Sequence, residues 1–190
     1  MTDLMHADEI RQYVKHAYSS IQSTGGVSAK ELYSPDELAL VPASTIDLSL
    51  GVANHLRWAD LPVSATVLDI GCGAGIDSIL AAHRVGPSGR VVALDFLPEM
   101  LGRTREGAAA AGTPSVEVLQ GTMEAIPLRA ASIDVVVSNG VINLSPRKAR
   151  VFAECARVVR PGGQLCMSDI MIDEEDLPPE VLTHPAAWAG

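Results

Sequence analysis

The sequence predicts an α/β protein with a mostly parallel sheet that carries helices on both faces. From residue 66 onward, short runs rich in β-branched residues alternate with stretches whose apolar residues recur at helical spacing. The first run is followed by a glycine-rich loop, Gly71-Cys72-Gly73-Ala74-Gly75, where a strand would turn into a helix. Alternating strands and helices pair in parallel through right-handed crossovers, and ligands then bind at the carboxyl ends of the strands.

Five segments carry the strand pattern, and each is bounded by glycine, proline or polar residues. The expected strands are residues 66–70, 91–94, 116–119, 133–138 and 164–168. Helical spacing between them predicts helices over residues 77–85, 98–111 and 147–159. We expect Pro161-Gly162-Gly163 to end the last helix and to turn the chain into the fifth strand.

The N-terminal part predicts a helix followed by a loop. Over residues 8–21 the apolar residues recur at spacings of three and four, and they are Ile10, Tyr13, Val14, Ala17 and Ile21. Residues 23–42 contain Gly25-Gly26 and a Ser34-Pro35 turn, which predict a loop with one helical turn. We expect this part to form a flap over the sheet.

A length of 190 residues suits one folded domain. We divide it into an N-terminal helix and lid at 1–60, an α/β core at 61–170 and an acidic C-terminal segment at 171–190. The acidic run Asp173-Glu174-Glu175-Asp176 is expected to be a solvated surface turn.

The composition excludes several classes of protein. A formal net charge of −9 argues against nucleic acid as a partner, because phosphate binding needs clustered lysine and arginine. The N-terminus lacks a secretory pattern, and no apolar run approaches the roughly 20 residues that span a bilayer. We therefore expect a cytoplasmic protein that does not contact membranes. Cys72, Cys155 and Cys166 are far apart in the sequence, which predicts reduced thiols and no metal site.

The glycine loop favours an adenosine ligand that carries an amino acid. Its spacing is GxGxG, whereas a dinucleotide fingerprint would place its third glycine at Ile76. Asp69, at the end of the preceding strand, supplies a carboxylate that can hold an ammonium but would repel a pyrophosphate. The alternative is a tight strand-to-helix turn with no ligand.

Polar residues follow the later strands as well. Asp95 lies about 20 residues past the loop, as expected for an acid that accepts hydrogen bonds from ribose hydroxyls, although an exposed strand-end acid is the alternative. Gly121-Thr122-Met123-Glu124 could flank an adenine ring, or Met123 could be a core residue. After the fourth strand, Asn143 either faces the same crevice or caps the next helix.

With DIGCGAG, VVALD, GTMEAIP and RVVRPGG in this order, the chain resembles a class I S-adenosylmethionine-dependent methyltransferase over residues 61–169. The stretch VSNGVINLSP, together with Asp77 and Ser168-Asp169, resembles the arsenite methyltransferase branch. The resemblance implies a Rossmann-like fold, a cytoplasmic enzyme and S-adenosylmethionine as cofactor. It also implies that the closing antiparallel strands of relatives, which follow the equivalent of Trp188, are missing.

The resemblance implies roles for individual residues. The methionyl end of the cofactor is assigned to Asp69, Gly71, Cys72, Gly73, Gly75 and Asp77. The ribose and adenine sides are assigned to Asp95, Phe96, Met100, Thr122, Met123 and Glu124. The region beside the sulfonium is assigned to Asn139. Apart from the resemblance, the position of Gly140 and Asn143 after the fourth strand suggests the acceptor side, and Tyr13 and Tyr18 would line it if the N-terminal helix is a lid, the alternative being that they only pack the helix.

The chain departs from the arsenite branch where the metalloid binds. The branch has cysteines where this chain has Gly140 and where it reads Leu50-Gly51-Val52-Ala53, and trivalent arsenic is held by thiolates. Cys72 could face the site, whereas Cys155 and Cys166 are expected in the core. We therefore expect a small-molecule acceptor other than free arsenite.

In-line methyl transfer needs alignment and exclusion of water, not a covalent protein intermediate. Should the acceptor lose a proton, positional candidates for a base are His16, His55 and Asn143. Three alternatives stay open: a non-catalytic S-adenosylmethionine-binding module, a fragment of a longer enzyme such as an arsenite methyltransferase, and an NAD-dependent reductase. The last requires a GxGxxG loop and a Tyr-Lys pair that the sequence lacks.

Overall fold

The computed structural model describes residues 2–19 and 23–171, with side chains from residue 9 onward. The acidic segment expected at 171–190 lies outside these residues except for its first member, and Ile21 of the expected first helix also lies outside them. No helix within the described residues combines the length and apolar character that a bilayer span requires.

The centre of the fold is a five-stranded sheet in which every pairing is parallel. Its strands are β1 (Thr66–Ile70), β2 (Arg90–Asp95), β3 (Val116–Gln120), β4 (Ile133–Asn139) and β5 (Val159–Ser168). Their order across the sheet is β3-β2-β1-β4-β5, so the direction of winding reverses between β1 and β4. The predicted parallel α/β architecture is confirmed, and this reversal is the point where open sheets bind ligands.

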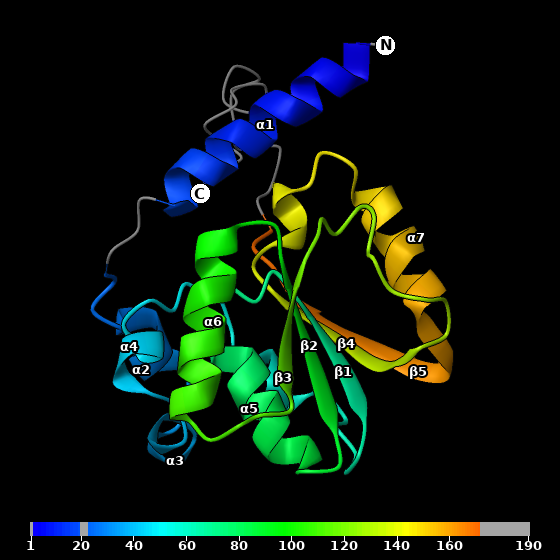
Figure 1. Ribbon diagram of the computed structural model, residues 1–190. Coiled ribbons are helices and arrows are strands. Elements are labelled where there is room, and N and C mark those ends of the chain that lie inside the picture. The colour runs from blue at the N-terminus through cyan, green and yellow to red at the C-terminus, as the bar shows by residue number, and fades with distance from the viewer. Residues whose placement is uncertain (1, 20–22, 172–190) are drawn as a thin grey trace.

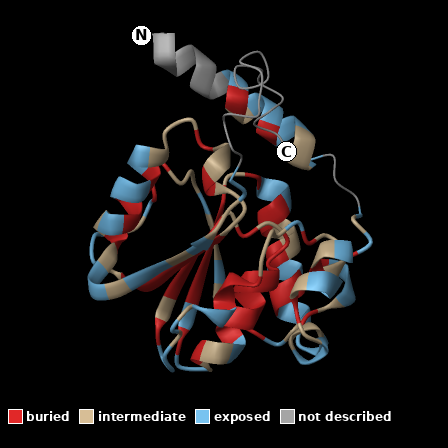
Figure 2. Cartoon of the chain, turned by 180° about the vertical axis from the view of Figure 1, so that it is seen from behind, coloured by how far each residue is buried: buried red, intermediate tan, exposed pale blue. Residues whose placement is uncertain are grey.

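Three helices cover the two faces of the sheet (Figure 1). They are α5 (Ile76–Val85), α6 (Pro98–Ala110) and α7 (Lys148–Val158). Alternate residues of β1 point to opposite faces, so Val67 packs in the cluster that contains α5 while Leu68 packs in the cluster that contains α7. The buried strands and α5 form a continuous interior in Figure 2.

The transition from α7 to β5 differs from the prediction. The helix ends at Val158 and β5 begins at Val159, so Pro161-Gly162-Gly163 lies inside the strand and does not form the turn between the two elements. The register shows the reason: Ile133 of β4 pairs with Val159, but Val135 pairs with Gln164. The extra residues of β5 bulge out of the ladder, and Gly162 takes a φ of 83° there.

The N-terminal part contains more helix than predicted. It comprises α1 (Thr2–Ser19), α2 (Val27–Leu32), α3 (Pro35–Ala39), α4 (Ala43–Ile46) and the 3-10 turn η1 (His55–Arg57). The expectation of a loop with one helical turn over 23–42 was therefore wrong. In α3 the Ser34 hydroxyl accepts from the Glu37 N–H while the Glu37 carboxylate accepts from the Ser34 N–H, and this capping box starts the helix.

Tertiary packing holds the short helices in place. Ala29, Tyr33, Val41 and Leu56 are buried in the same cluster as α5 and the strands. Burial of this apolar surface compensates for the weak stability of such short helices in isolation. Residues 23–57 are consequently built onto the core, and α1 lies across the carboxyl end of the sheet (Figure 1).

Candidate functional site

A cavity of about 140 Å³ lies at the carboxyl ends of the strands. We call its strand-end side the floor, which consists of the lining residues within 69–77, 94–100 and 121–124. We call the rest of the lining the cover, which consists of the lining residues within 11–18, 48–51 and 139–144 and includes the carboxyl end of β4. The floor is built by the loops after β1, β2 and β3, and the cover by α1, the segment after α4 and the loop after β4.

The glycine loop of the floor needs two of its glycines for packing as well as for conformation. Gly71 has a φ of 72°, and a Cβ there would meet Cγ2 of Val141 at 2.6 Å. Gly75 has a φ of 93°, and a Cβ there would meet the side chain of Thr104 at 2.9 Å. Gly71 lines the cavity, whereas Gly75 does not and instead permits the close approach of α6.

Asp95 joins the second strand to the glycine loop. One of its carboxylate oxygens accepts from the Gly73 N–H at 3.1 Å, and the other accepts from the Leu97 N–H at 2.9 Å. Burial raises the pKa of Asp95, and these backbone hydrogen bonds oppose that shift. Asp95 lines the cavity, so a strand-end acid and the loop face one ligand space.

Asp69 is a buried carboxyl at the end of β1, with 2% of its surface exposed. It accepts a hydrogen bond from the Ser78 hydroxyl. Burial, and next the negative charge of Asp77, raise the pKa of Asp69 to about 8. A cation bound in the cavity would favour the ionised form, so this part of the floor is suited to a positively charged group.

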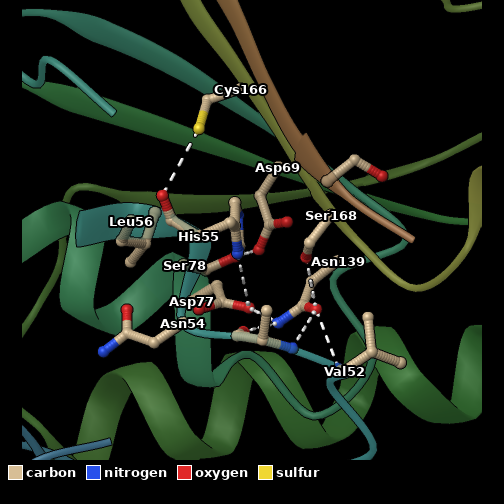
Figure 3. Close-up of polar contacts among 12 residues, drawn as sticks. Val52, Asn54, His55, Leu56, Asp69, Asp77, Ser78, Asn139, Cys166 and Ser168 are labelled. Atoms are coloured by element: carbon tan, nitrogen blue, oxygen red, sulfur yellow. Dashed lines mark hydrogen bonds and ion pairs between the residues drawn. The ribbon is translucent and has the colours of Figure 1, made fainter. Parts of the chain in front are cut away.

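A polar network links the floor to the cover (Figure 3). Asp77 accepts from the Tyr33 hydroxyl at 2.7 Å and from the side-chain amide of Asn139 at 2.9 Å. The Asn139 amide also donates to the Ala53 carbonyl at 2.8 Å. Its oxygen accepts from the Val52 N–H at 2.9 Å and from the Ser168 hydroxyl at 3.0 Å.

Asn139 lines the cavity, as the sequence led us to expect, but both ends of its amide are bonded within the protein. Its hydrogen bonds hold the backbone of residues 51–53 against β4. A Cβ on Gly51 would overlap the Asn139 amide nitrogen, so only glycine permits this approach.

The residues predicted for the ribose and adenine sides meet in the floor. Phe96, Met100, Thr122, Met123 and Glu124 all line the cavity. The Glu124 carboxylate accepts from the Ser145 hydroxyl at 2.6 Å and lies 3.9 Å from the Arg11 guanidinium.

Several sequence-predicted residues lie elsewhere. Tyr13 is 48% exposed and does not line the cavity, whereas Tyr18 does. Asn143 donates through its backbone to the Asp169 carboxylate and through its side chain to the Ile170 carbonyl, so it braces the chain after β5. Of the positional base candidates, His16 is exposed on α1 and outside the cavity.

His55 is also outside the cavity, with 1% of its surface exposed. Its Nδ1 lies 4.0 Å from the Asp77 carboxylate, and burial lowers its pKa. A neutral, enclosed imidazole cannot take a proton directly from a ligand in the cavity.

Sequence reasoning missed most of the cover. Its members beyond the predicted Tyr18, Asn139 and Gly140 are Arg11, Val14, Leu48, Ser49, Leu50, Gly51, Val141 and Leu144. Arg11 and Val14 stand seven and four positions before Tyr18, a helical spacing that could have identified them. Leu48 and Ser49 carry no local signal, whereas Leu50-Gly51 belongs to the stretch that the resemblance had already placed at the metalloid site of the arsenite branch.

The thiols of the chain are separated and protonated. Cys72 lines the cavity and lies 3.5 Å from the Thr104 hydroxyl, and burial raises its pKa well above the usual range. Cys155 belongs to the cluster of α7, where burial raises its pKa to about 11. Cys166 packs against the cluster of α5. Across residues 2–19 and 23–171 no group of three potential metal ligands occurs.

The two positions at which the arsenite branch has cysteines are neighbours in space. A Cβ on Gly140 would lie 3.0 Å from Cγ1 of Val52. The valine therefore fills the space in front of the glycine, and an apolar contact occupies this corner of the site.

Comparison with known proteins agrees with this geometry. A family model described as a methyltransferase domain matches residues 63–189. The arsenite methyltransferase of Halobacterium salinarum is 40% identical over 158 residues, which cover 83% of this chain and 40% of that protein. A demethylmenaquinone methyltransferase of Listeria monocytogenes is 37% identical over 122 residues, 60% of this chain and 52% of that protein.

A solved structure is also similar. The crystal structure of an arsenic(III) S-adenosylmethionine methyltransferase from Chlamydomonas reinhardtii superposes with a TM-score of 0.72 at 36% identity. The match covers 80% of this chain and 53% of that one. The chain thus spans only 40% to 53% of the length of these three relatives.

Proposed function

The chain belongs to the methyltransferase-domain family, and on this premise we propose that it uses S-adenosylmethionine to methylate a small-molecule acceptor other than free arsenite. When bound, this cofactor supplies a methyl group from a sulfonium. In such a transfer the acceptor's lone pair would form the new bond, the leaving thioether would keep the bonding electron pair, and the acceptor's proton would be released. The residues of the cavity would hold the two molecules in line.

The observation that carries the proposal is the convergence of Asp69, the glycine loop and Asp95 on one cavity. These residues fit the cofactor, because the loop admits a ligand against bare backbone and the two carboxyls suit an ammonium and ribose hydroxyls. Asp69, Gly71, Gly73 and Asp77 would hold the methionyl end.

The remaining floor residues would hold the other end of the cofactor. Asp95 and Phe96 are assigned to the ribose, and Thr122, Met123 and Glu124 to the adenine. Their shared place in the floor supports this assignment. The dry, buried surroundings would exclude water from the transfer and align its partners.

The chemistry of the thiols supports an acceptor other than arsenite. Soft trivalent arsenic needs thiolates, but burial raises the pKa of Cys72 and Cys155, and the three cysteines lie in different parts of the core. The contact between Val52 and Gly140 offers only carbon atoms. A net charge of −9 disfavours nucleic acid, and we propose a small-molecule enzyme of the cytoplasm.

The second candidate acceptor is arsenite itself, which the 40% identity to the Halobacterium salinarum protein favours. Calorimetric titration with S-adenosylmethionine, NADH and arsenite separates the possibilities. We expect binding of S-adenosylmethionine alone. Binding of NADH in place of S-adenosylmethionine would overturn the proposal. Tight binding of arsenite to the cofactor-loaded chain would instead support arsenite as the acceptor.

A further inference from the structure

The cavity carries its charge on one side. Asp69, Asp77, Asp95 and Glu124 are buried carboxyls of the floor. Among the described residues that line the cover, Arg11 alone is charged, and its guanidinium lies 3.9 Å from the Glu124 carboxylate. The charged end of Arg11 is thus directed to the floor, and the rest of the cover is uncharged.

Aliphatic side chains form a large part of the cover. They belong to five of the eleven described residues that line it, namely Val14, Leu48, Leu50, Val141 and Leu144. Burial of a ligand's apolar area against such a surface favours binding, whereas burial of a charged group there disfavours it.

Two hydroxyls interrupt the apolar surface. Ser49 is 3% exposed and lines the cavity, and its hydroxyl has no hydrogen-bond partner among the residues that the structure describes. A buried polar atom of this kind indicates a partner that the protein itself does not supply. Tyr18 is the second hydroxyl, and its pKa is raised by burial and then by the charge of Asp169, so it stays neutral.

We infer that the cover is the acceptor subsite and that it takes an uncharged, largely apolar molecule with a hydroxyl or similar heteroatom, which hydrogen bonds to Ser49. This inference rests on the proposed function and specifies its substrate class. An acceptor of either charge would lose its hydration against the leucines and valines of the cover.

Three phenols of nearly equal size test the charge preference: 4-ethylphenol, 4-hydroxyphenylacetate and tyramine, which are neutral, anionic and cationic. Each is titrated calorimetrically into the full chain saturated with S-adenosylhomocysteine, the demethylated product, so that no turnover occurs. We expect the neutral phenol to bind at least about tenfold more tightly than either charged one. Equal binding of all three, tighter binding of a charged phenol, or no binding of any would overturn the inference.

Two substitutions locate the subsite. Leu50→Lys places a cation on the cover and should shift the preference toward 4-hydroxyphenylacetate by about tenfold. Leu40→Lys is the matched control, because Leu40 and Leu50 are both 43% exposed but Leu40 does not line the cavity. Ser49→Ala should weaken binding of 4-ethylphenol about fivefold without lowering the melting temperature, since its hydroxyl has no partner in the protein to lose.

The same titrations separate the two proposals. S-adenosylmethionine binding is measured on wild type and on all three variants. If the cofactor binds but the phenol preference or its reversal by Leu50→Lys is absent, the acceptor subsite is wrong and the methyltransferase proposal stands. If wild type does not bind the cofactor, both proposals fail together.

Discussion

The floor and the cover of the cavity face the same ligand space but are held in place by different means. The floor is a continuation of the strands, and hydrogen bonds from the Gly73 and Leu97 backbones fix Asp95 within it. The cover comes from segments distant in sequence, and the Asn139 side chain on β4 bonds the backbone of residues 52 and 53 to the sheet. A strand-end loop is positioned by the sheet, whereas a cover of this kind depends on a few tertiary contacts and can change its chemistry without disturbing the sheet.

The largest effect is expected from Asp95→Ala in the floor. The change removes the acceptor for two backbone N–H groups and the carboxylate that faces the ligand, so affinity for S-adenosylmethionine should fall about 100-fold or more. Calorimetric titration measures it, with Asp60→Ala as a control because Asp60 is exposed and outside the cavity. Unchanged affinity in Asp95→Ala would show that the floor is not the cofactor site.

Gly71→Ala tests whether backbone geometry fixes the floor. Alanine would have to keep the unfavourable positive φ of this position, and its Cβ would overlap Val141. Together these effects should lower the unfolding free energy by about 3 kcal/mol. Gly102→Ala is the matched control, since it lies inside α6 with open space around it and should stabilise by up to about 1 kcal/mol. Denaturant unfolding compares them, and equal stabilities would contradict the packing role of Gly71.

Asn139→Ala tests the connection between floor and cover. Loss of the amide leaves the Val52 N–H and one Asp77 oxygen without this partner, which should cost about 2 kcal/mol of unfolding free energy. Hydrogen exchange at the Val52 and Ala53 amides should accelerate while exchange in β1 stays slow. Asn143→Ala serves as the control, because it removes a half-buried amide that bonds the Ile170 carbonyl and not residues 51–53. Unchanged exchange at Val52 would mean that the cover has other supports.

A pH series tests the electrostatics of the floor. Asp69 has a folded-state pKa raised to about 8, so the folded state holds a proton that the unfolded state releases from about pH 4 upward. Its contribution to unfolding free energy therefore falls as pH rises from about 4 to 8. Over this pH range the unfolding free energy of wild type should fall by at least about 1 kcal/mol more than that of Asp69→Asn. Parallel pH profiles of the two proteins would show that the raised pKa of Asp69 is not the cause of the pH dependence.

Much of the floor could be predicted because its determinants are local. The strand expected at 66–70 coincides with β1, and the glycine loop and Asp95 follow from the spacing of a strand, a turn and a helix. Asp69, Gly71, Gly73 and Asp95 were all anticipated, and all line the cavity.

The cover could not be predicted in the same way. Tyr13 and Asn143 were expected at the acceptor side because of their sequence positions, but helix rotation exposes Tyr13, and Asn143 braces the chain after β5. Ser49 carries no motif. Its carbonyl accepts from the Ser28 hydroxyl at 3.0 Å, and the nearby Val52 N–H donates to Asn139, a bond between residues separated by 87 positions.

By itself, the sequence determined the parallel α/β fold, the glycine loop and the acids that face it, because glycine φ preferences and strand alternation act over a few neighbouring residues. Only the tertiary structure decided that the segment before β1 becomes short helices packed on α5 and that Pro161-Gly162-Gly163 bulges within β5. It also decided that a largely aliphatic cover faces the acidic floor, with a Ser49 hydroxyl that has no partner among the described residues. These features arise from contacts between distant parts of the chain, whose burial outweighs local propensity.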